Sequence, residues 1–484
     1  MSVEAETLLR QAQSHKQAGR PADAAEAYEA LLTLRPNMPD TWFNLALMQR
    51  QAGRPAAALA SYQEALDRRI GGPEEVHLNR AVIYSDDLGQ ADAAEAELKT
   101  ALAILPTYLA AWLNLGNLYE DKGEREQARS AYRRALDLSP PQSAPLALAR
   151  LANATRFTDA ADPLIADLRA MQARPGATDA DRAEVGYALG RALDEVQSYD
   201  EAFAAYAVAN AASRKATGAR YDRAAQEAFV DRSIAAFPKP VPTVWDPTGA
   251  PVFILGMFRS GSTLVERILA AHDGLTSGGE LALLLRIVAG IAAYPEAAGE
   301  ASQATALDWR KAYLDQLHAA RPNPGPGAAL VTDKRPDNFL HIGLIKTMFP
   351  DAKIIHTVRQ PLDMILSNWF LHLDGSMAYA MDLEDGAHWY GQHERLMAHW
   401  KALYPDILTV DYDALVADPW PEIERILNYC GLDWQDQVMD FHKAGGAVRT
   451  ASVWQIREPL YRKSSGRWRN YEAHLGGLRA ALGE

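Results

Sequence analysis

Cysteine is almost absent from this chain of 484 residues, since Cys430 is the one thiol. A single cysteine excludes an intrachain disulfide, so we expect a reducing compartment, the cytoplasm. Residues 2–6 lack the basic region, followed by an apolar region, that is typical of a secretion signal. The best membrane candidate, residues 281–294, is interrupted by Arg286 and is too short to span a bilayer. We therefore expect no membrane association.

Positive charge is in the minority. The chain has 49 Lys and Arg against 62 Asp and Glu, a net charge of -13. This balance argues against nucleic acid as a partner, although a local basic pocket can still bind a small anion. The hydrophobic fraction of 48% and the charged fraction of 23% are typical of folded proteins. The length predicts more than one domain.

Internal repetition dominates the first 140 residues. A small residue recurs along the chain, and a bulky residue follows four positions after each copy. The members are Ala24, Ala58, Ala94 and Ala128, followed by Tyr28, Tyr62, Leu98 and Tyr132. The bulky residues are 34, 36 and 34 positions apart, which is the period of tetratricopeptide repeats. We predict an all-α solenoid over 1–140, which binds a peptide or protein partner, packs on the rest of the chain or dimerises.

The remaining chain divides into three further regions. Residues 141–236 have a helical period, with a degenerate repeat at about 183–216. A proline-rich stretch at 237–250 is a predicted linker. In residues 251–484, apolar runs alternate with helical stretches, which predicts an α/β domain with a parallel sheet. These runs are 252–255, 329–331, 353–358 and 407–410.

The segment at 251–263 reads as a buried strand that leads into a phosphate-binding loop. Gly256 and Gly261 have P-loop spacing, but Ser262 stands where nucleoside triphosphate enzymes have lysine. That lysine reaches the β- and γ-phosphates, so its loss argues against a kinase or a triphosphatase. The backbone N–H groups and the helix start near Ser262 still favour an anion. Arg259 supplies a cation within the loop.

Several segments of residues 251–484 together resemble the sulfotransferases that use 3′-phosphoadenosine 5′-phosphosulfate, and most closely tyrosylprotein and bacterial tetratricopeptide-linked sulfotransferases. The segments are Arg-Ser-Gly-Ser-Thr at 259–263, the strand and helix start at 354–361, and the stretches at 410–415, 450–459 and 461–470. The resemblance implies a P-loop-like α/β fold, this nucleotide as co-substrate without a metal, and a hydroxyl acceptor. A peptide or protein tyrosine is the favoured acceptor. A carbohydrate or small alcohol is an alternative, as is an interaction scaffold with an inactive transferase domain.

The resemblance also implies which residues bind the donor. Those around the 5′-phosphosulfate are Arg259, Ser260, Gly261, Ser262 and Thr263, with Ser452 nearby. Those around the 3′-phosphate and adenine are Arg359, Ser367, Tyr412, Arg462 and Lys463. A guanidinium group suits this task because its fork geometry matches phosphate oxygens. The alternatives are a surface charge at Arg359, packing or capping at Tyr412 and Ser452, and a solvated basic run at 461–470.

Three residues are implied to take part in the reaction. Glu280 matches the family's catalytic glutamate, a general base for the acceptor hydroxyl. Its alternative is a place in the first turn of a helix that begins at Leu281. Lys334 matches a lysine that approaches the transferred group, and with Arg259 it would neutralise charge on the leaving oxygen. His272 is a rival base, although it fits a helix C-terminus better. No histidine has zinc-site spacing with cysteine, so we predict no metal site.

Overall fold

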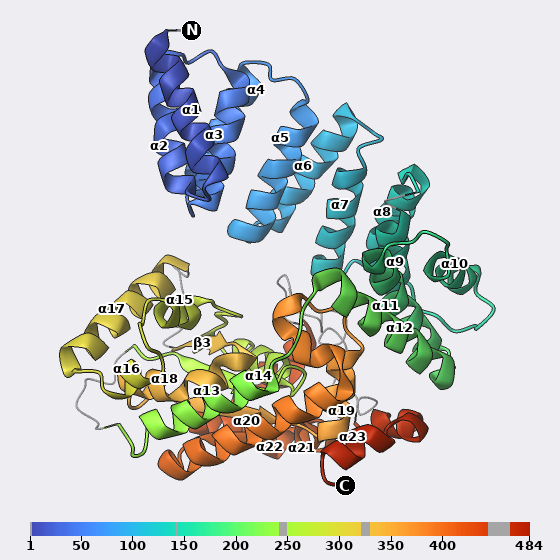
Figure 1. Cartoon of the computed structure of the whole chain (residues 1–484), viewed down its shortest axis with the longest axis vertical. Helices are drawn as coiled ribbons and strands as arrows, with labels where there is room; N and C mark the ends of the chain where they lie inside the picture. Colours follow the sequence, from blue (N-terminus) through green and yellow to red (C-terminus); the bar gives the residue numbers. More distant parts are fainter. Residues whose placement is uncertain (1, 142–143, 242–248, 321–329, 444–464) are drawn as a thin grey trace. The chain divides into compact units, whose positions relative to one another are not determined.

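The computed structural model describes residues 2–141, 144–241, 249–320, 330–443 and 465–484 (Figure 1). The chain forms two compact units, the first ending at Arg156 and the second beginning at Phe157. Within the described ranges, the helices are either too short or too polar to cross a bilayer.

The first unit is built of successive helix pairs. Its helices are α1 (Val3–Gln17), α2 (Pro21–Leu34), α3 (Pro39–Gln51), α4 (Pro55–Asp67), α5 (Pro73–Val82), α6 (Ala91–Ile104), α7 (Leu109–Lys122), α8 (Arg125–Leu138) and α9 (Ala144–Ala154). A π-helical turn, η1 (Ile83–Asp87), follows α5. Proline occupies the first turn of α2, α3, α4 and α5, where its missing N–H costs no helical hydrogen bond.

The repeated residues fill equivalent places in these pairs. All four repeated alanines are fully buried, and the four bulky residues that follow them are at most 2% exposed. The Trp42 and Trp112 indole groups each donate a hydrogen bond to the carbonyl of a preceding proline, at 2.8 and 2.9 Å. Gly116 allows α7 to meet Tyr132 of α8, because a Cβ there would lie 2.3 Å from the ring. The predicted tetratricopeptide solenoid is confirmed.

The second unit opens with helices rather than with its sheet. These are α10 (Pro163–Gln172), α11 (Asp179–Glu195), α12 (Tyr199–Thr217) and α13 (Arg223–Ala236). Helix α11 begins with a capping box, in which Thr178 and Asp181 each bond the other's backbone N–H. The predicted degenerate repeat at 183–216 lies within the pair α11 and α12, which belongs to this unit by its contacts. Residues 242–248 of the predicted linker lie outside the described residues.

A five-stranded parallel sheet forms the centre of the second unit. Its strands are β1 (Val252–Gly256), β2 (Leu275–Thr276), β3 (Leu330–Lys334), β4 (Ile354–Val358) and β5 (Leu408–Asp411), in the order β2-β3-β1-β4-β5. All four pairings are parallel. The predicted α/β domain is therefore confirmed.

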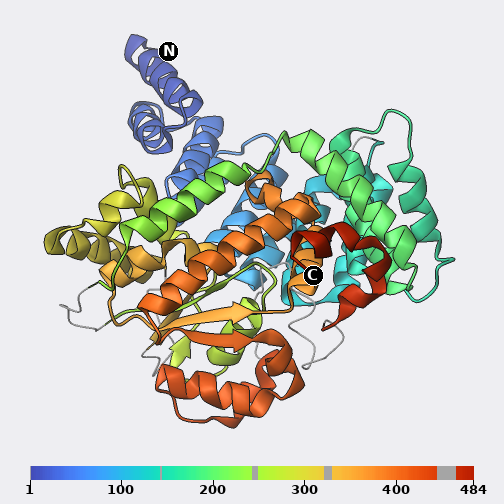
Figure 2. The ribbon, with the colours of Figure 1, turned by 60° about the horizontal axis from the view of Figure 1, so that its bottom comes forward.

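Helices cover both faces of this sheet because its strand residues alternate between two cores. Phe253 and Leu255 face a core shared with α13, α15 (Leu283–Ala289), α17 (Gln303–Ala320), α18 (Ile342–Met348) and α20 (Leu383–Leu403). Val252 and Ile254 face a core with α14 (Ser262–Ala270), α21 (Tyr412–Ala417) and α22 (Pro419–Cys430). Helices α13 and α20 lie side by side over the first face (Figure 2).

Short elements complete the unit. They are α16 (Glu296–Gly299), α19 (Pro361–Trp369), α23 (Gly476–Ala481) and the 3-10 segments η2 (Pro336–His341), η3 (Gly375–Met381), η4 (Asp436–Lys443) and η7 (Arg467–His474).

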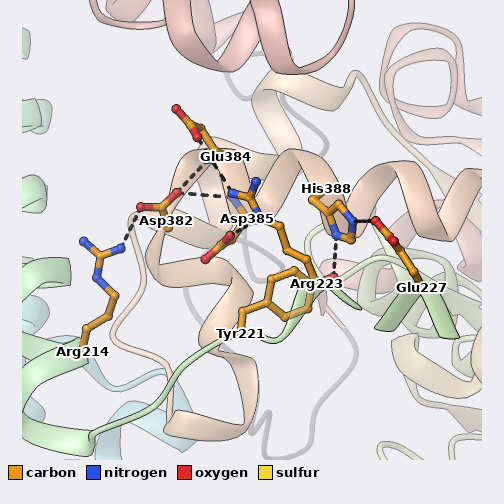
Figure 3. A network of polar contacts seen from close by, with 8 residues as sticks. All are labelled: Arg214, Tyr221, Arg223, Glu227, Asp382, Glu384, Asp385 and His388. Carbon is orange, nitrogen blue, oxygen red and sulfur yellow. Dashed lines mark hydrogen bonds and ion pairs between the residues drawn. The ribbon is translucent and has the colours of Figure 1, made fainter. Parts of the chain in front are cut away.

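A polar network ties the end of α12, the start of α13 and Tyr221 between them to the start of α20 (Figure 3). Its hydrogen bonds and ion pairs join Arg214 to Asp382 at 2.7 Å, Arg223 to Asp385 at 2.7 Å, Tyr221 to His388 at 2.9 Å and His388 to Glu227 at 2.8 Å. An exposed ion pair contributes less than about 1 kcal/mol, but several pairs here join the same two segments. The network therefore fixes this helical connection onto α20.

We expect Gly116→Ala to destabilise the first unit. Alanine favours a helix over glycine by about 1 kcal/mol, but overpacking against the fully buried Tyr132 costs about 1–3 kcal/mol. Calorimetry of the full chain would show a lower unfolding temperature for that unit. The matched control is Gly391→Ala in α20, where nothing lies within 4 Å and the change should stabilise or be neutral. A Gly116→Ala variant as stable as the wild type would contradict this packing.

Candidate active site

The carboxyl ends of the five parallel strands meet at one edge of the sheet. The loop 257–261 follows β1, and Lys334 is the last residue of β3. Arg359 comes directly after β4, and Tyr412 directly after β5. Glu280 follows β2 by four residues. Ligands of open α/β sheets bind at this edge, outside the carboxyl ends of the strands.

The loop after β1 adopts a conformation that only its glycines allow at two points. Gly256 has φ 144° and Gly261 has φ 103°. A Cβ on Gly256 would lie 2.4 Å from the Thr357 carbonyl oxygen, and one on Gly261 would lie 2.7 Å from the Tyr412 ring. Arg259 also has a positive φ, 68°. The loop is thus pressed between β4 and the start of α21.

Side chains of the loop differ in what they contact. The Ser260 side chain is fully buried, and its hydroxyl contacts the Met257 carbonyl at 2.5 Å and the Thr357 hydroxyl at 2.7 Å. It therefore holds the shape of the loop. Gly261 is the N-cap of α14, and Ser262 and Thr263 form its first turn. Their backbone N–H groups lie at the positive end of this helix.

Arg259, Ser367, Arg359 and Tyr412 form one connected cluster. Arg259 Nε donates to Ser367 Oγ at 2.9 Å. Arg359 Nη1 donates to the Arg259 carbonyl oxygen at 3.3 Å, and its guanidinium lies 4.8 Å from the centre of the Tyr412 ring. Two guanidinium groups and the start of a helix within one cluster favour the binding of an anion. The structure thus brings together residues that the resemblance assigns to opposite ends of a nucleotide donor.

Glu280 and Lys334 form an ion pair at the same edge. Lys334 Nζ donates to Glu280 Oε1 at 2.5 Å. The lysine side chain is 1% exposed, whereas that of Glu280 is 35% exposed. The carboxylate is therefore open to solvent on one side, and the ammonium group approaches it from the core.

A buried carboxylate, Glu266 in α14, holds the turn before Glu280. Glu266 Oε1 accepts from the Gly279 N–H at 2.9 Å and from the Thr332 hydroxyl at 2.7 Å. Thr332 Oγ1 accepts from the Gly278 N–H at 3.0 Å, and a Cβ on Gly278 would lie 1.9 Å from the Thr332 carbonyl oxygen. Glu266 was not predicted, although an acidic residue among the apolar residues of a phosphate-loop helix is a visible signal.

Asp333 lies next to Lys334 in β3 and contacts a different set of residues. The Tyr313 hydroxyl donates to it at 2.5 Å, and Asn338 Nδ2 donates at 3.2 Å. Burial raises the pKa of Asp333 to about 7. Successive side chains of a strand point to opposite faces, so this carboxyl group belongs to the core rather than to the Glu280 pair.

Two aspartates anchor the start of the last described segment, 465–484. Asp363 in α19 accepts from the N–H groups of Gly466 and Trp468 at 2.5 and 2.7 Å. Asp413 accepts from the Ser465 hydroxyl at 2.5 Å. Burial raises the pKa of Asp363 despite these hydrogen bonds. The predicted donor residues Ser452, Arg462 and Lys463 lie outside the described residues.

His272, the rival base, is engaged at both ring nitrogens. Nδ1 accepts from the Gly274 N–H at 2.9 Å, and Nε2 lies 2.9 Å from the Asp433 carbonyl oxygen. The ring is 6% exposed. It therefore holds the turn between α14 and β2, and no nitrogen is left for an acceptor hydroxyl.

Family comparisons match both parts of the chain. Residues 251–436 match the model of the sulfotransferase family, and residues 9–73 and 109–142 match models of the tetratricopeptide repeat. The chain therefore combines tetratricopeptide repeats with a sulfotransferase-family domain, as the sequence predicts.

Individual relatives cover different shares of the chain. An "uncharacterized protein" of Aquifex aeolicus (strain VF5) is 31% identical over 422 residues, 83% of this chain, and the match spans 54% of that relative. A "Putative protein-tyrosine sulfotransferase" of Caenorhabditis briggsae is 24% identical over 226 residues, 45% of this chain and 80% of the relative. Among solved structures, the sulfotransferase domain from the Synechococcus PCC 7002 olefin synthase is 25% identical, with a TM-score of 0.34, over 48% of this chain and 91% of that domain.

We expect Asp333 to make stability fall between pH 5 and pH 7. An unfolded aspartate, with a pKa near 3.9, has lost its proton in this range, whereas folded Asp333 keeps it up to about pH 7. Folding then takes up a proton, so the free energy of unfolding falls as pH rises, by at most about 1.4 kcal/mol per pH unit.

Asp333→Asn, which resembles the neutral acid, should remove this component. Unfolding temperatures of wild type and variant, measured from pH 5 to pH 7, should diverge in their pH dependence. Parallel curves would show that Asp333 does not keep its proton in the folded protein.

Proposed function

We propose that the protein transfers a sulfuryl group from 3′-phosphoadenosine 5′-phosphosulfate to an acceptor hydroxyl. The observation that supports this most directly is the arrangement at the carboxyl edge of the sheet. There the Arg259, Ser367 and Arg359 cluster and the Glu280–Lys334 pair follow strands of one parallel sheet. The sulfotransferase-family match over 251–436 favours this chemistry over other uses of an anion site.

The cationic groups suit a donor with anions at two positions. Arg259, with the loop 260–263 at the start of α14, would hold the 5′-phosphosulfate, and Ser452 would approach it. Arg359 and Ser367 would hold the 3′-phosphate, with Tyr412 beside the adenine. Arg462 and Lys463 would add charge at the 3′-phosphate. This second anchor would distinguish the donor from ATP, and Arg259 and Lys334 would supply the positive charge that Mg²⁺ supplies in nucleoside triphosphate enzymes.

The Glu280–Lys334 pair would carry the transfer itself. Glu280 accepts the proton of the acceptor hydroxyl as its oxygen bonds to sulfur. The bond between sulfur and the oxygen of the 5′-phosphate breaks, and the electron pair stays with adenosine 3′,5′-bisphosphate. Lys334 and Arg259 stabilise the negative charge that grows on this oxygen.

The acceptor that we propose is a tyrosine in a peptide or protein. Two observations favour it: the relative named as a protein-tyrosine sulfotransferase, and a repeat array of a class that commonly binds peptides. The array would then hold the acceptor or another protein partner. A carbohydrate or small alcohol is the second candidate. We place the reaction in the cytoplasm, where the single, buried Cys430 stays reduced.

The donor site predicts selective stabilisation by nucleotide. Adenosine 3′,5′-bisphosphate at 100 times its dissociation constant should stabilise the protein by about 2.7 kcal/mol, whereas ATP with Mg²⁺ should not. Thermal shift measures both. Arg359→Ala should lose the shift, and the control Arg425→Ala, which removes an exposed arginine paired with Glu422, should keep it. Stabilisation by ATP with Mg²⁺ alone would favour a kinase instead.

Glu280→Gln should lower transfer by about 10²- to 10⁴-fold, because glutamine cannot accept the proton. The assay is transfer of labelled sulfate to proteins of a cell extract and to tyrosine peptides. The control is donor binding, which Glu280→Gln should leave intact. Equal labelling by wild type and variant would dismiss Glu280 as the base. Donor binding without labelling of any acceptor by the wild type would favour the interaction scaffold.

A further inference from the structure

The helix pair α11 and α12 packs against the end of α19 and the residues that directly follow it. Tyr206 stacks on Phe370 with ring centres 4.3 Å apart. Asn210 Nδ2 donates to the Trp369 carbonyl oxygen at 2.9 Å, and Tyr187 stacks on His372 at 5.0 Å. This side of the pair is therefore covered by other residues of the second unit.

The same pair also holds the C-terminal segment. The Asp194 carboxylate at the end of α11 accepts from the Arg467 guanidinium and from the Tyr471 hydroxyl. Its side chain is 11% exposed. Phe203 stacks on His474 with centres 4.4 Å apart. Because a carboxylate so far from water needs partners, Asp194 favours the docked position of Arg467 and Tyr471.

This segment reaches the candidate donor site through its first residues. Asp363, which accepts from the N–H groups of Gly466 and Trp468, lies one turn before Ser367 on the same face of α19. Asp413 accepts from the Ser465 hydroxyl at 2.5 Å and from the N–H of Gln360 at 3.0 Å. The segment thus contacts the immediate neighbours of Arg359, Ser367 and Tyr412.

We propose that Asp194 is a positioning residue for the donor site. By holding Arg467 and Tyr471 it keeps residues 465–468 on Asp363 and Asp413, and these contacts fix α19 and the start of α21 where they present Ser367 and Tyr412. The inference rests on the proposed function, since it assigns the purpose of this contact to donor binding. It also makes α11 and α12 a part of the transferase rather than a repeat that binds a partner.

The test compares Asp194→Asn with wild type in the full chain. Isothermal calorimetry would measure binding of adenosine 3′,5′-bisphosphate and of adenosine 5′-phosphate. We expect at least tenfold weaker binding of the bisphosphate and a smaller preference for it over the monophosphate. Hydrogen exchange should become faster at the amides of Gly466 and Trp468. The control Asp200→Asn, whose side chain is 89% exposed and pairs with His474, should change affinity less than twofold.

Tyr471→Phe keeps the ring and removes only the hydroxyl that donates to the Asp194 carboxylate. It serves as the test if Asp194→Asn fails to fold. It should weaken bisphosphate binding severalfold with the same loss of preference. Faster exchange with unchanged affinity and preference would overturn the inference, because the contact would then be only structural. Unchanged exchange would overturn it as well. A wild-type protein that binds neither nucleotide would refute the proposed function itself, and the inference with it.

Discussion

Parallel pairing of β1 with β3 and β4 is the constraint on which the candidate site depends. It aligns Ile254 with Lys334 and Gly256 with Thr357, so the loop after β1 emerges between the ends of its two neighbours. A shift of one residue in β3 would turn Lys334 into the opposite core and bring Asp333 to the Glu280 side. The register therefore decides which of two adjacent ionisable side chains meets the carboxylate.

Hydrogen bonds of buried carboxylates then fix the loops that follow these strands. Glu266 is 5% exposed, and a buried carboxylate is unfavourable unless its oxygens are bonded. Its bonds to Gly279 and Thr332 compensate for this burial and fix the turn that presents Glu280. Asp363 acts in the same way on the C-terminal segment. In both places a buried carboxylate with no direct part in the proposed transfer fixes a segment beside residues that have one.

The sequence predicts the parts of the site that follow strand ends. Arg359 directly follows the apolar run 353–358, Lys334 follows the run 329–331 by three residues, and the family resemblance implied the roles of both. Gly256 and Gly261 could be found because their spacing is local. Glu266 stands out as an acidic residue in an apolar helix, but what it contacts could not be predicted, because Thr332 lies 66 positions away; Asp194 gives no such signal, and Arg467 lies 273 positions away. The boundaries between regions could not be predicted from the sequence for the same reason, since they depend on contacts between distant residues. Residues 141–236 look continuous in helical period, yet the partners of α11 and α12 are Trp369 and Tyr471.

The pair α11 and α12 shows how one repeat can serve a different purpose. Its interior keeps the repeat pattern. Gly190 lies against the Tyr206 ring just as Gly116 lies against the Tyr132 ring, and in both cases the glycine precedes the tyrosine by 16 positions. Its outer positions differ. When Tyr206 of α12 is aligned with Tyr132 of α8, Tyr199 and Phe203 occupy the positions of Arg125 and Arg129. Arg129 is 42% exposed and pairs with Glu126, whereas Phe203 contacts Trp369 and His474. Aromatic residues at these two positions favour packing within the chain, and charged residues favour solvent. These two outer positions therefore distinguish the helix pair that packs within the second unit from a repeat whose outer face carries charged residues.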